Sequence, residues 1–320
     1  METPAAQGWI KVFAPASVAN LGPGFDALGV ALEGLGDTVR ARRLDGEGQG
    51  VVIREMTGEA ANIPIDAAKN CAGRAAEAVI RQLRGKAAKE SGLEMTIHKG
   101  LPQGSGLGSS AASAVGGAVA AHLLFGSELG SNRLLEAALE GEALASGARH
   151  ADNLAPSLLG GFTIVKGHAP LEVVRLDAPS AIRFVLVLPQ MEIETRYARS
   201  VLPETIRLED AVTNWANVAA LVAAIARGDV ADIGHAVVDH VIEPVRSKLI
   251  PGFAEVKRAA LEAGAHGCSI SGAGPALFAV TTAERGEQVG LAMQAAFQRH
   301  GLGSRRFVCA PDNRGARRID

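Results

Sequence analysis

A glycine-rich segment at residues 102–113 constrains the fold of this chain more than any other stretch. The alternating residues 93–99 before it predict a strand, and the small and aliphatic residues that run to Phe125 after it predict a helix. Three glycines within five residues allow backbone N–H groups to converge on one point without clashes between Cβ atoms. A helix that begins at Ser109 or Ser110 adds its unpaired N–H groups and the positive end of its dipole. The segment therefore predicts an anion site, most often a phosphate site.

Three other interpretations of this loop differ in how well they explain its residues. A P-loop needs a lysine just before its Ser or Thr, whereas Gly108 here is followed directly by Ser109. The dinucleotide fingerprint fits Gly106, Gly108 and Ala111. That fold needs a second strand next, but the segment from Ser131 predicts a helix. A plain tight turn between sheet and helix stays open, although it leaves the paired serines at the helix mouth unexplained.

The composition excludes several classes of protein. With 320 residues and 48% hydrophobic content, the chain can bury a sizeable core and is expected to form two domains. A net charge of −2 argues against a nucleic-acid partner, and 4% aromatic residues offer few stacking platforms. Cys71, Cys268 and Cys309 are odd in number and scattered, which fits neither a metal site nor a disulfide framework and suits a reducing cytosol.

Targeting and membrane segments are not expected either. Residues 1–8 are polar and lack the apolar core of a signal peptide. The most apolar run, residues 111–125, is short, rich in Ala and Gly, and contains His122. We therefore expect a cytoplasmic protein without a membrane partner.

The hydrophobic periodicity predicts a mixed α+β protein, because strands and helices alternate without a strict βαβ repeat. The composition loosens around residues 166–170, which predicts a domain boundary that separates residues 1–166 from residues 167–320. The basic residues Arg314, Arg317 and Arg318 predict a solvated tail. Strands are predicted at 9–19, 37–44, 50–56, 93–99, 160–165, 171–176, 182–188, on both sides of Gly272 and at 305–309, and helices at 69–84, 109–125, 131–146, 209–227, 229–240, 252–263 and 284–300.

A carboxylate on an apolar helix face is the clearest anomaly. In the helix predicted at 131–146, Glu142 falls in the middle of the apolar arc. Such a carboxylate is costly unless the edge of the arc reaches solvent or the group meets a cation or donors. If it faces the glycine loop, it could bind Mg²⁺, which takes one or two carboxylates together with phosphate oxygens. Ser110 could add a hydroxyl ligand.

Polar residues in three further places suggest a site for a small molecule. Residues 147–153 follow a helix and read GARHADN, which is either an ordinary polar loop or part of a site. Arg199 and Arg246 are either surface charges or, together with Asp26, a set that suits a zwitterionic amino acid. Arginine grips a carboxylate with a bidentate fork, and aspartate meets the ammonium group.

A second glycine turn, SISGAGP at residues 269–275, lies between two β-prone runs. It is either a hairpin loop or an element that packs beside the first loop and closes the phosphate site from the other domain.

Taken together, these motifs resemble the homoserine kinases of the GHMP kinase superfamily nearly end to end. The glycine-serine loop is shared across that superfamily and does not name a substrate. The four segments that are specific to homoserine kinases are Pro15–Asp26, His150–Ser157, Thr195–Arg199 and Glu243–Arg246. The glycine-serine loop Gly106–Ser113 and the second glycine turn Ser271–Pro275 also match.

The resemblance implies a fold and an activity. The N-terminal domain would be like the second domain of ribosomal protein S5, and the C-terminal domain would be ferredoxin-like. The activity would be ATP-dependent phosphorylation of the L-homoserine hydroxyl to O-phospho-L-homoserine, within threonine biosynthesis. Members of this family are commonly dimeric, which implies a possible homodimer. Two alternatives remain: another GHMP small-molecule kinase, and a non-catalytic sensor of ATP or an amino acid.

The resemblance also implies roles for individual residues. Ser110 and Glu142 would hold Mg²⁺, and Asn70 would line the adenine pocket. Lys99 is a further candidate donor to phosphate. The residues that would hold homoserine are Asn20, Asp26, His150, Asn153, Thr195, Arg199 and Arg246. The loop that would hold ATP consists of Pro102, Gln103, Gly104, Ser105, Gly106, Leu107, Gly108, Ser109, Ser110, Ala111 and Ala112.

No general base is expected from these residues. Several members of the superfamily have an aspartate base near the position of Asn153, and an asparagine cannot take a proton. Asp152 is adjacent but would point elsewhere if the backbone is extended. We therefore expect that positioning and charge stabilisation carry the phosphoryl transfer.

Overall fold

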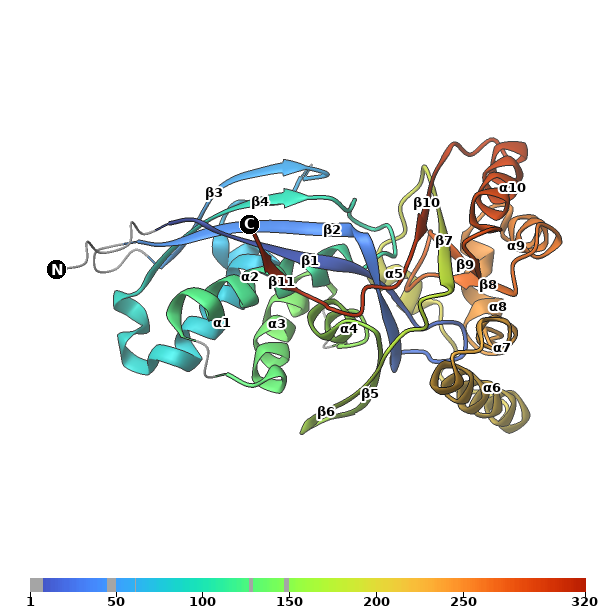
Figure 1. Ribbon diagram of the computed structural model, residues 1–320, viewed down its shortest axis with the longest axis horizontal. Coiled ribbons are helices and arrows are strands. Elements are labelled where there is room, and N and C mark those ends of the chain that lie inside the picture. Colours follow the sequence, from blue (N-terminus) through green and yellow to red (C-terminus); the bar gives the residue numbers. More distant parts are fainter. Residues whose placement is uncertain (1–7, 45–49, 61, 127–128, 147–149) are drawn as a thin grey trace.

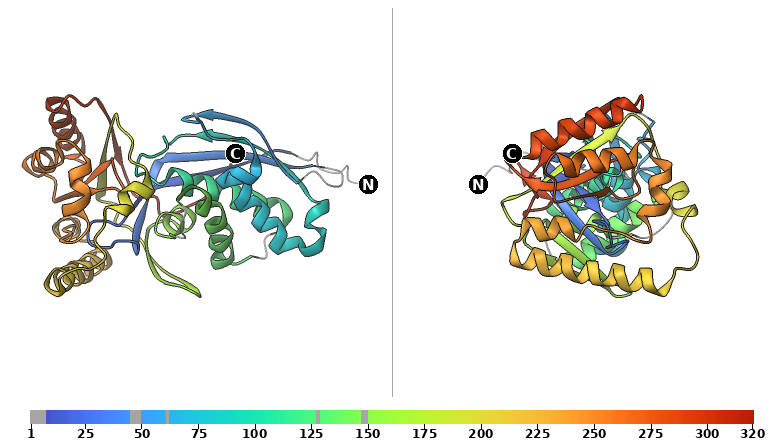
Figure 2. Two further views of the ribbon diagram at one scale, coloured as in Figure 1. Left: turned by 180° about the vertical axis from the view of Figure 1, so that it is seen from behind. Right: turned by 90° about the vertical axis from the view of Figure 1, so that its right-hand side faces the viewer.

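The computed structural model describes residues 8–44, 50–60, 62–126, 129–146 and 150–320. Two β-sheets lie at opposite ends of the long axis, each with helices packed against it (Figure 1). Within the described residues, the larger sheet has seven strands and the smaller sheet has four. Figure 2 shows the same division from behind and from the end that carries the smaller sheet. The glycine-rich loop lies where the two parts meet.

The larger sheet follows the order β11-β1-β2-β4-β3, with β5 paired to β2 and β6 paired to β5. Strands β3 and β4 are parallel, and the other pairs are antiparallel. The strands are β1 (Ile10–Ala19), β2 (Leu28–Leu44), β3 (Val51–Gly58), β4 (Gly92–Lys99), β5 (Phe162–His168), β6 (Leu171–Leu176) and β11 (Arg317–Ile319).

Helices α1 to α4 cover one face of this sheet (Figure 1). Helix α2 is the central one and is buried along nearly its whole length, because Ala, Gly and Val side chains let its neighbours pack closely around it. The helices are α1 (Cys71–Arg84), α2 (Ser109–Phe125), α3 (Ser131–Ser146) and α4 (Leu154–Leu159), with 3₁₀ turns η1 (Ala67–Lys69) and η2 (Gly85–Glu90).

The smaller sheet is antiparallel, in the order β10-β7-β9-β8. Its strands are β7 (Ile182–Pro189), β8 (Gly267–Ile270), β9 (Leu277–Thr282) and β10 (Ser304–Cys309). In the end-on view of Figure 2, α10 and α9 lie above and the long helix α6 lies below. The helices are α5 (Thr195–Ser200), α6 (Leu208–Arg227), α7 (Val230–His235), α8 (Glu243–Arg246), α9 (Phe253–Glu262) and α10 (Gly286–Arg299), with the 3₁₀ turn η3 (Ser247–Leu249).

Strand β7 belongs to two cores at once, because its side chains alternate between the two faces of the smaller sheet. Phe184 and Leu186 belong to the large core that extends into the first sheet and its helices. Val185 and Val187 belong to a second core, formed with α9 and α10. The two parts of the molecule are therefore joined by apolar packing as well as by the chain.

Most predicted elements are confirmed, and the helices at 109–125 and 131–146 end where predicted. The helix predicted at 229–240 is wrong in length, since α7 ends at His235. The predicted solvated tail is also wrong, because residues 317–319 form β11 and pair with β1. The predicted boundary between residues 166 and 167 falls inside β5, and β5 and β6 both belong to the first sheet. The chain passes to the second sheet between Leu176 and Ile182.

No helix in the described residues combines the length and the apolar character needed to cross a bilayer.

Candidate active site

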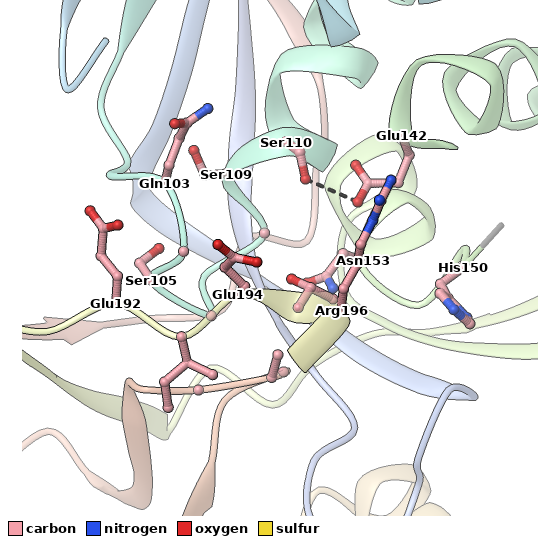
Figure 3. A pocket seen from close by; sticks show the side chains of 18 of the residues that line it. Gln103, Ser105, Ser109, Ser110, Glu142, His150, Asn153, Glu192, Glu194 and Arg196 are labelled. Atoms are coloured by element: carbon pink, nitrogen blue, oxygen red, sulfur yellow. Dashed lines mark hydrogen bonds between the residues drawn. The ribbon is translucent and has the colours of Figure 1, made fainter. Parts of the chain in front are cut away.

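A cavity of about 570 Å³ lies where the glycine-rich loop meets the second part of the chain. Its walls come from that loop, the first turn of α2, helix α3, the β1–β2 turn, α5, α8 and the glycine turn after β8. Figure 3 shows loop side chains, such as Gln103 and Ser105, with Glu142 and Asn153 in the same view. Four predicted sets of residues, for phosphate, metal, ammonium and carboxylate, thus share one cavity.

The loop adopts the left-handed backbone that its glycines were expected to supply. Gly106 and Gly108 have φ of +80° and +70°. A Cβ on Gly106 would lie 2.4 Å from the carbonyl oxygen of Ser271, and a Cβ on Gly108 would lie 2.3 Å from Ser17 Oγ. Both positions therefore exclude any side chain, for reasons of conformation and of space. Gly108 is also the N-cap of α2, so the free N–H groups of that helix begin at the cavity wall.

Lys99 fixes the end of this loop through buried hydrogen bonds. Its side chain is 1% exposed, and its ammonium group donates to Asp37, to the carbonyl oxygen of Ser109 at 2.7 Å and to Ser113 Oγ at 2.8 Å. These bonds use all three of its donors. The geometry therefore assigns Lys99 to fixing the start of α2. Lys99 also lines the cavity, and its direct contact with phosphate stays a prediction.

The second glycine turn packs against the first, as one of the two interpretations predicted. Ser271 Oγ donates to the carbonyl oxygen of Gly106 at 2.7 Å, and the N–H of Ala276 donates to the carbonyl oxygen of Ser105 at 3.2 Å. Gly272, on the same turn, lines the cavity. The second part of the chain therefore closes the phosphate end of the site.

The side chains of Ser110 and Glu142 are in contact at the N-terminus of α2. Ser110 Oγ donates to Glu142 Oε1 at 2.9 Å (Figure 3). Burial raises the pKa of Glu142 to about 7, although the hydrogen bond from Ser110 lowers it. The predicted pair is thus brought together, and a cation placed there would offset the cost of burying the carboxylate.

Asp26 and Arg199 form a bidentate ion pair across the other end of the cavity. Arg199 donates from Nη1 and Nη2 to the two carboxylate oxygens of Asp26, at 3.0 and 2.8 Å. His150 Nδ1 lies 3.6 Å from Asp26 Oδ2. Residues 147–149, from the same predicted polar loop as His150, lie outside the described residues. The sequence could not indicate that Asp26 and Arg199 pair with each other.

Arg246 is buried against backbone carbonyl groups. It is 3% exposed and donates to the carbonyl oxygens of Ala198 and Gly272, each at 3.1 Å. Burial, and then the positive charge of Arg199, lower its pKa. Asn20 Nδ2 donates to the same carbonyl oxygen of Gly272 at 2.9 Å. Asn20 therefore joins the β1–β2 turn to the second glycine turn, and Arg246 joins α8 and α5 to the same turn.

Asp152 lines the cavity, so the expectation that it would point elsewhere is wrong. The backbone is not extended there: residues 152 and 153 form a turn that leads into α4. Asp152 is 4% exposed, and burial followed by the negative charge of Asp26 raises its pKa to about 7. Its neighbour Asn153 accepts a hydrogen bond from Ser17 Oγ at 2.8 Å. Both side chains therefore belong to the site.

The structure treats some predicted ligand residues differently. Asn70 lines the cavity, but its Oδ1 caps α1 and its Nδ2 donates to the carbonyl oxygen of Pro64. Leu107, Ala111 and Ala112 place their side chains in the core, so they can contribute only backbone groups. Pro102 is not part of the cavity wall.

The remaining predicted residues line the cavity: Asn20, Asp26, Gln103, Gly104, Ser105, Gly106, Gly108, Ser109, Ser110, Glu142, His150, Asn153, Thr195, Arg199 and Arg246.

Besides Asp152, three charged residues of the wall were not predicted. Glu192 and Glu194 lie between β7 and α5, Arg196 lies in the first turn of α5, and all three line the cavity (Figure 3). For Glu192 and Glu194 the signal was their position just after a strongly apolar strand, where binding residues are common, and Arg196 lies within the matching segment Thr195–Arg199.

Comparison with known proteins agrees with this geometry. The family description "GHMP kinases N terminal domain" matches residues 70–161, and "GHMP kinases C terminal" matches residues 221–299. A homoserine kinase of Arabidopsis thaliana is 47% identical over 317 residues, which cover 97% of this chain and 85% of that protein. The chain belongs to the homoserine kinase family.

Further members of the homoserine kinase family extend the comparison. A homoserine kinase of Pyrococcus furiosus is 41% identical over 302 residues, which cover 93% of this chain and 97% of that protein. The crystal structure of homoserine kinase from Cytophaga hutchinsonii superimposes with a TM-score of 0.91 at 43% identity and covers both chains completely. The two-domain fold expected for this family is therefore confirmed.

Proposed function

We propose that this protein phosphorylates the side-chain hydroxyl of L-homoserine with ATP, giving O-phospho-L-homoserine and ADP, a step of threonine biosynthesis. The observation that carries the proposal is that one cavity holds both a nest of backbone amides and a paired carboxylate and guanidinium. Amides suit the triphosphate, and the two charges suit the two ends of an α-amino acid.

In this proposal the loop binds and orients the nucleotide. Backbone N–H groups of the loop and the first turn of α2 bind the phosphates and stabilise the charge that develops on the transferred group. The bond from the γ-phosphorus to the ADP oxygen breaks as the bond to the homoserine oxygen forms, and the hydroxyl proton passes to an oxygen of the transferred phosphoryl group and then to solvent. Donors fixed in advance in this way contribute roughly 3 kcal/mol each to transition-state stabilisation.

Ser110 and Glu142 suit the Mg²⁺ that accompanies ATP. One hydroxyl and one carboxylate match the way Mg²⁺ binds, because this ion keeps most of its coordination positions for phosphate oxygens and water. Within the described residues no group of three His, Cys, Asp or Glu side chains could hold a metal ion. In this proposal phosphate oxygens and water take the remaining coordination positions. When bound, the ion would neutralise charge on the β- and γ-phosphates.

At the other end, Asp26 and Arg199 grip the amino acid. The substrate ammonium forms an ion pair with Asp26, and the substrate carboxylate forms a bidentate ion pair with the guanidinium group of Arg199. These two ion pairs replace the one between Asp26 and Arg199. Asn153, the N-cap of α4, places its side chain beside the N-cap of α2, since its Oδ1 is 3.0 Å from the position of a Cβ on Gly108. Positioning of the hydroxyl toward the γ-phosphate supplies the main catalytic effect.

An ADP-release assay with four acceptors tests the proposal. ATP and Mg²⁺ are supplied with L-homoserine, mevalonate, galactose or shikimate, and we expect turnover with homoserine alone. Turnover with an acceptor that lacks the amino-acid head group, and none with homoserine, would refute the proposal in favour of another GHMP kinase.

The variant Glu142→Ala separates a kinase from a non-catalytic sensor. A kinase should lose turnover by at least about a hundredfold while it stays folded and still binds homoserine, because the metal ligand acts on the transferring phosphate. A sensor should bind both ligands with no turnover in either form.

A further inference from the structure

Phe25 lies between the two arginines of the amino-acid end. Its ring centroid is 5.2 Å from Cζ of Arg199 and 5.1 Å from Cζ of Arg246. The ring comes from the β1–β2 turn, whereas the arginines come from α5 and α8 in the second part of the chain. A guanidinium within about 6 Å of an aromatic centroid is attracted by the negative face of the ring. One side chain of the first part therefore contacts both cations of the second.

The two guanidinium groups need such a contact because they carry the same charge and lie close together. The charge of Arg199 helps to lower the pKa of Arg246, which is itself buried. Arg246 is held by the carbonyl oxygens of Ala198 and Gly272. In the described structure the carboxylate partner of Arg199 is Asp26.

Arg199 loses its ion-pair partner Asp26 once an amino acid binds. If the proposed function holds, the substrate ammonium engages Asp26, so Arg199 gives up that carboxylate and turns its fork to the substrate. Phe25 does not line the cavity, so its ring can keep its contact with both arginines while the substrate is bound. The ring is then the contact that Arg199 keeps in both states.

We propose that Phe25 is a positioning residue, whose ring face holds the Arg199 and Arg246 guanidinium groups where they can bind a substrate carboxylate. It acts through the arginines and does not touch the substrate. The inference deepens the proposed function and rests on it: the ligand class is a small molecule with a carboxylate beside an ammonium group.

A fluorination series tests the role of the ring face without changing its shape. Phenylalanine at position 25 is replaced by its 4-fluoro, 3,5-difluoro and 3,4,5-trifluoro analogues through amber suppression. Fluorine withdraws electron density from the ring face, so KM for homoserine should rise stepwise, by about tenfold for the trifluoro form. KM for ATP should stay within about twofold. A constant KM for homoserine across the series would overturn the proposal.

A second pair of variants checks the same point by mutation. Phe25→Leu keeps the apolar volume but removes the ring face, whereas Phe25→Tyr keeps both. We expect KM for homoserine to rise about tenfold in Phe25→Leu and to stay near the parent value in Phe25→Tyr. If Phe25→Leu raises KM for ATP and homoserine alike, the residue only maintains the fold and the proposal is wrong.

A readout without substrate separates this inference from the proposed function. The Nε–H of Arg246 donates to Ala198, so its ¹⁵N–¹H resonance should be sharp and shifted by the ring current of Phe25. Arg246→Lys assigns the resonance. If the shift is present in the parent protein and lost in Phe25→Leu, the ring contact is supported. If the parent protein at the same time fails to phosphorylate homoserine, only the proposed function is refuted. An unshifted resonance in the parent protein would refute the ring contact itself.

Discussion

At the scale of single residues, the proposed function gives the Asp26–Arg199 pair the choice of which molecules the cavity accepts. In the described structure the two groups satisfy each other. A ligand with only one charge would take one partner and leave the other without its ion pair, which costs free energy in a partly buried site. A zwitterion replaces both partners at once. The pair thus favours molecules with an ammonium and a carboxylate over analogues that lack either.

The variant Asp26→Asn should change this selectivity. We expect kcat/KM for homoserine to fall roughly 30- to 100-fold, because the ammonium loses its charged partner. For 4-hydroxybutanoate, which lacks the ammonium, kcat/KM should stay level or rise, because no carboxylate is left without a cation. Steady-state kinetics with both acceptors measure the ratio. Equal losses for both acceptors would contradict the exchange of partners.

Asp152 should make the free protein less stable as pH rises. Its pKa is about 7 in the folded protein and 3.8 as the ordinary value, so the folded state holds more protons between pH 4 and 7. Unfolding then becomes easier as pH rises through that window. Asp152→Asn removes this loss, and its free energy of unfolding should exceed that of the parent by about 2–4 kcal/mol above pH 7 and by almost nothing near pH 4.

Urea unfolding of both proteins between pH 4 and 8 measures that difference. A difference that does not change with pH would mean that Asp152 ionises at its ordinary pKa in the folded protein. In that case burial and the charge of Asp26 do not govern the group.

The sequence indicated which residue types line the cavity, but not which of them already have partners within the protein. Asn70 was a candidate for the adenine pocket through the family resemblance, and Lys99 was a candidate donor to phosphate. Their polar atoms instead bond to Asp37 and to the first turn of α1. Partners like Asp37, 62 residues away from Lys99, cannot be read from local patterns. Asp152 was missed for the opposite reason, since the backbone turn that aims it depends on tertiary packing.

At the scale of elements, the two glycine turns work as one unit. The hydroxyl of Ser271 on the second turn bonds to Gly106 on the first. Gly106 also faces the carbonyl oxygen of Ser271 without room for a side chain. The phosphate loop is therefore shaped by the second part of the chain as well as by its own glycines.

Gly106→Ala should separate these two turns. The new Cβ would meet the Ser271 carbonyl oxygen at 2.4 Å, in a residue with φ of +80°. We expect KM for ATP to rise at least about tenfold and the protein to lose about 2 kcal/mol or more of stability. Gly301→Ala is the matched control, because φ is +75° there and no atom lies within 4 Å. That variant should lose about 1 kcal/mol and keep its KM. Similar losses in both variants would show that backbone strain alone matters.

Helix periodicity predicted the elements better than it predicted their partners. Helices α2 and α3 were bounded correctly because apolar spacing is a local signal, as are the glycines Gly108 and Gly126 that flank α2. Strand β11 was taken for a solvated tail because its arginines look polar. In the structure Arg317 pairs with Asp312, which is 2% exposed, at 2.7 Å. The pairing of β11 with β1, at the opposite end of the sequence, has no local signature.

At the scale of the whole molecule, the shared core should make the protein unfold as one unit. Phe184 on β7 is fully buried, and its ring centroid lies 6.1 Å from those of Phe162 on β5 and Phe278 on β9. These rings join the first sheet to the second. Two domains with separate cores would show two transitions, whereas a continuous core predicts one.

Calorimetry of the free protein and of Phe184→Ala tests this. We expect a single transition in both proteins, and a loss of about 3–5 kcal/mol in the variant, because the large-to-small change leaves a cavity in the shared core. Val185→Ala, which alters the face packed on α9 and α10, serves as the comparison. If Phe184→Ala splits the transition while Val185→Ala does not, the two parts are coupled mainly through these rings.

The pairing of β11 with β1 sets an order of events during synthesis. Residue 319 is the partner of Lys11, so more than three hundred residues must leave the ribosome before the edge beside β1 is covered. Until then the nascent N-terminal part exposes an open strand that other chains could bind. Maturation of this edge therefore has to wait until β11 has been made, and before then this edge is where a chaperone would be most useful.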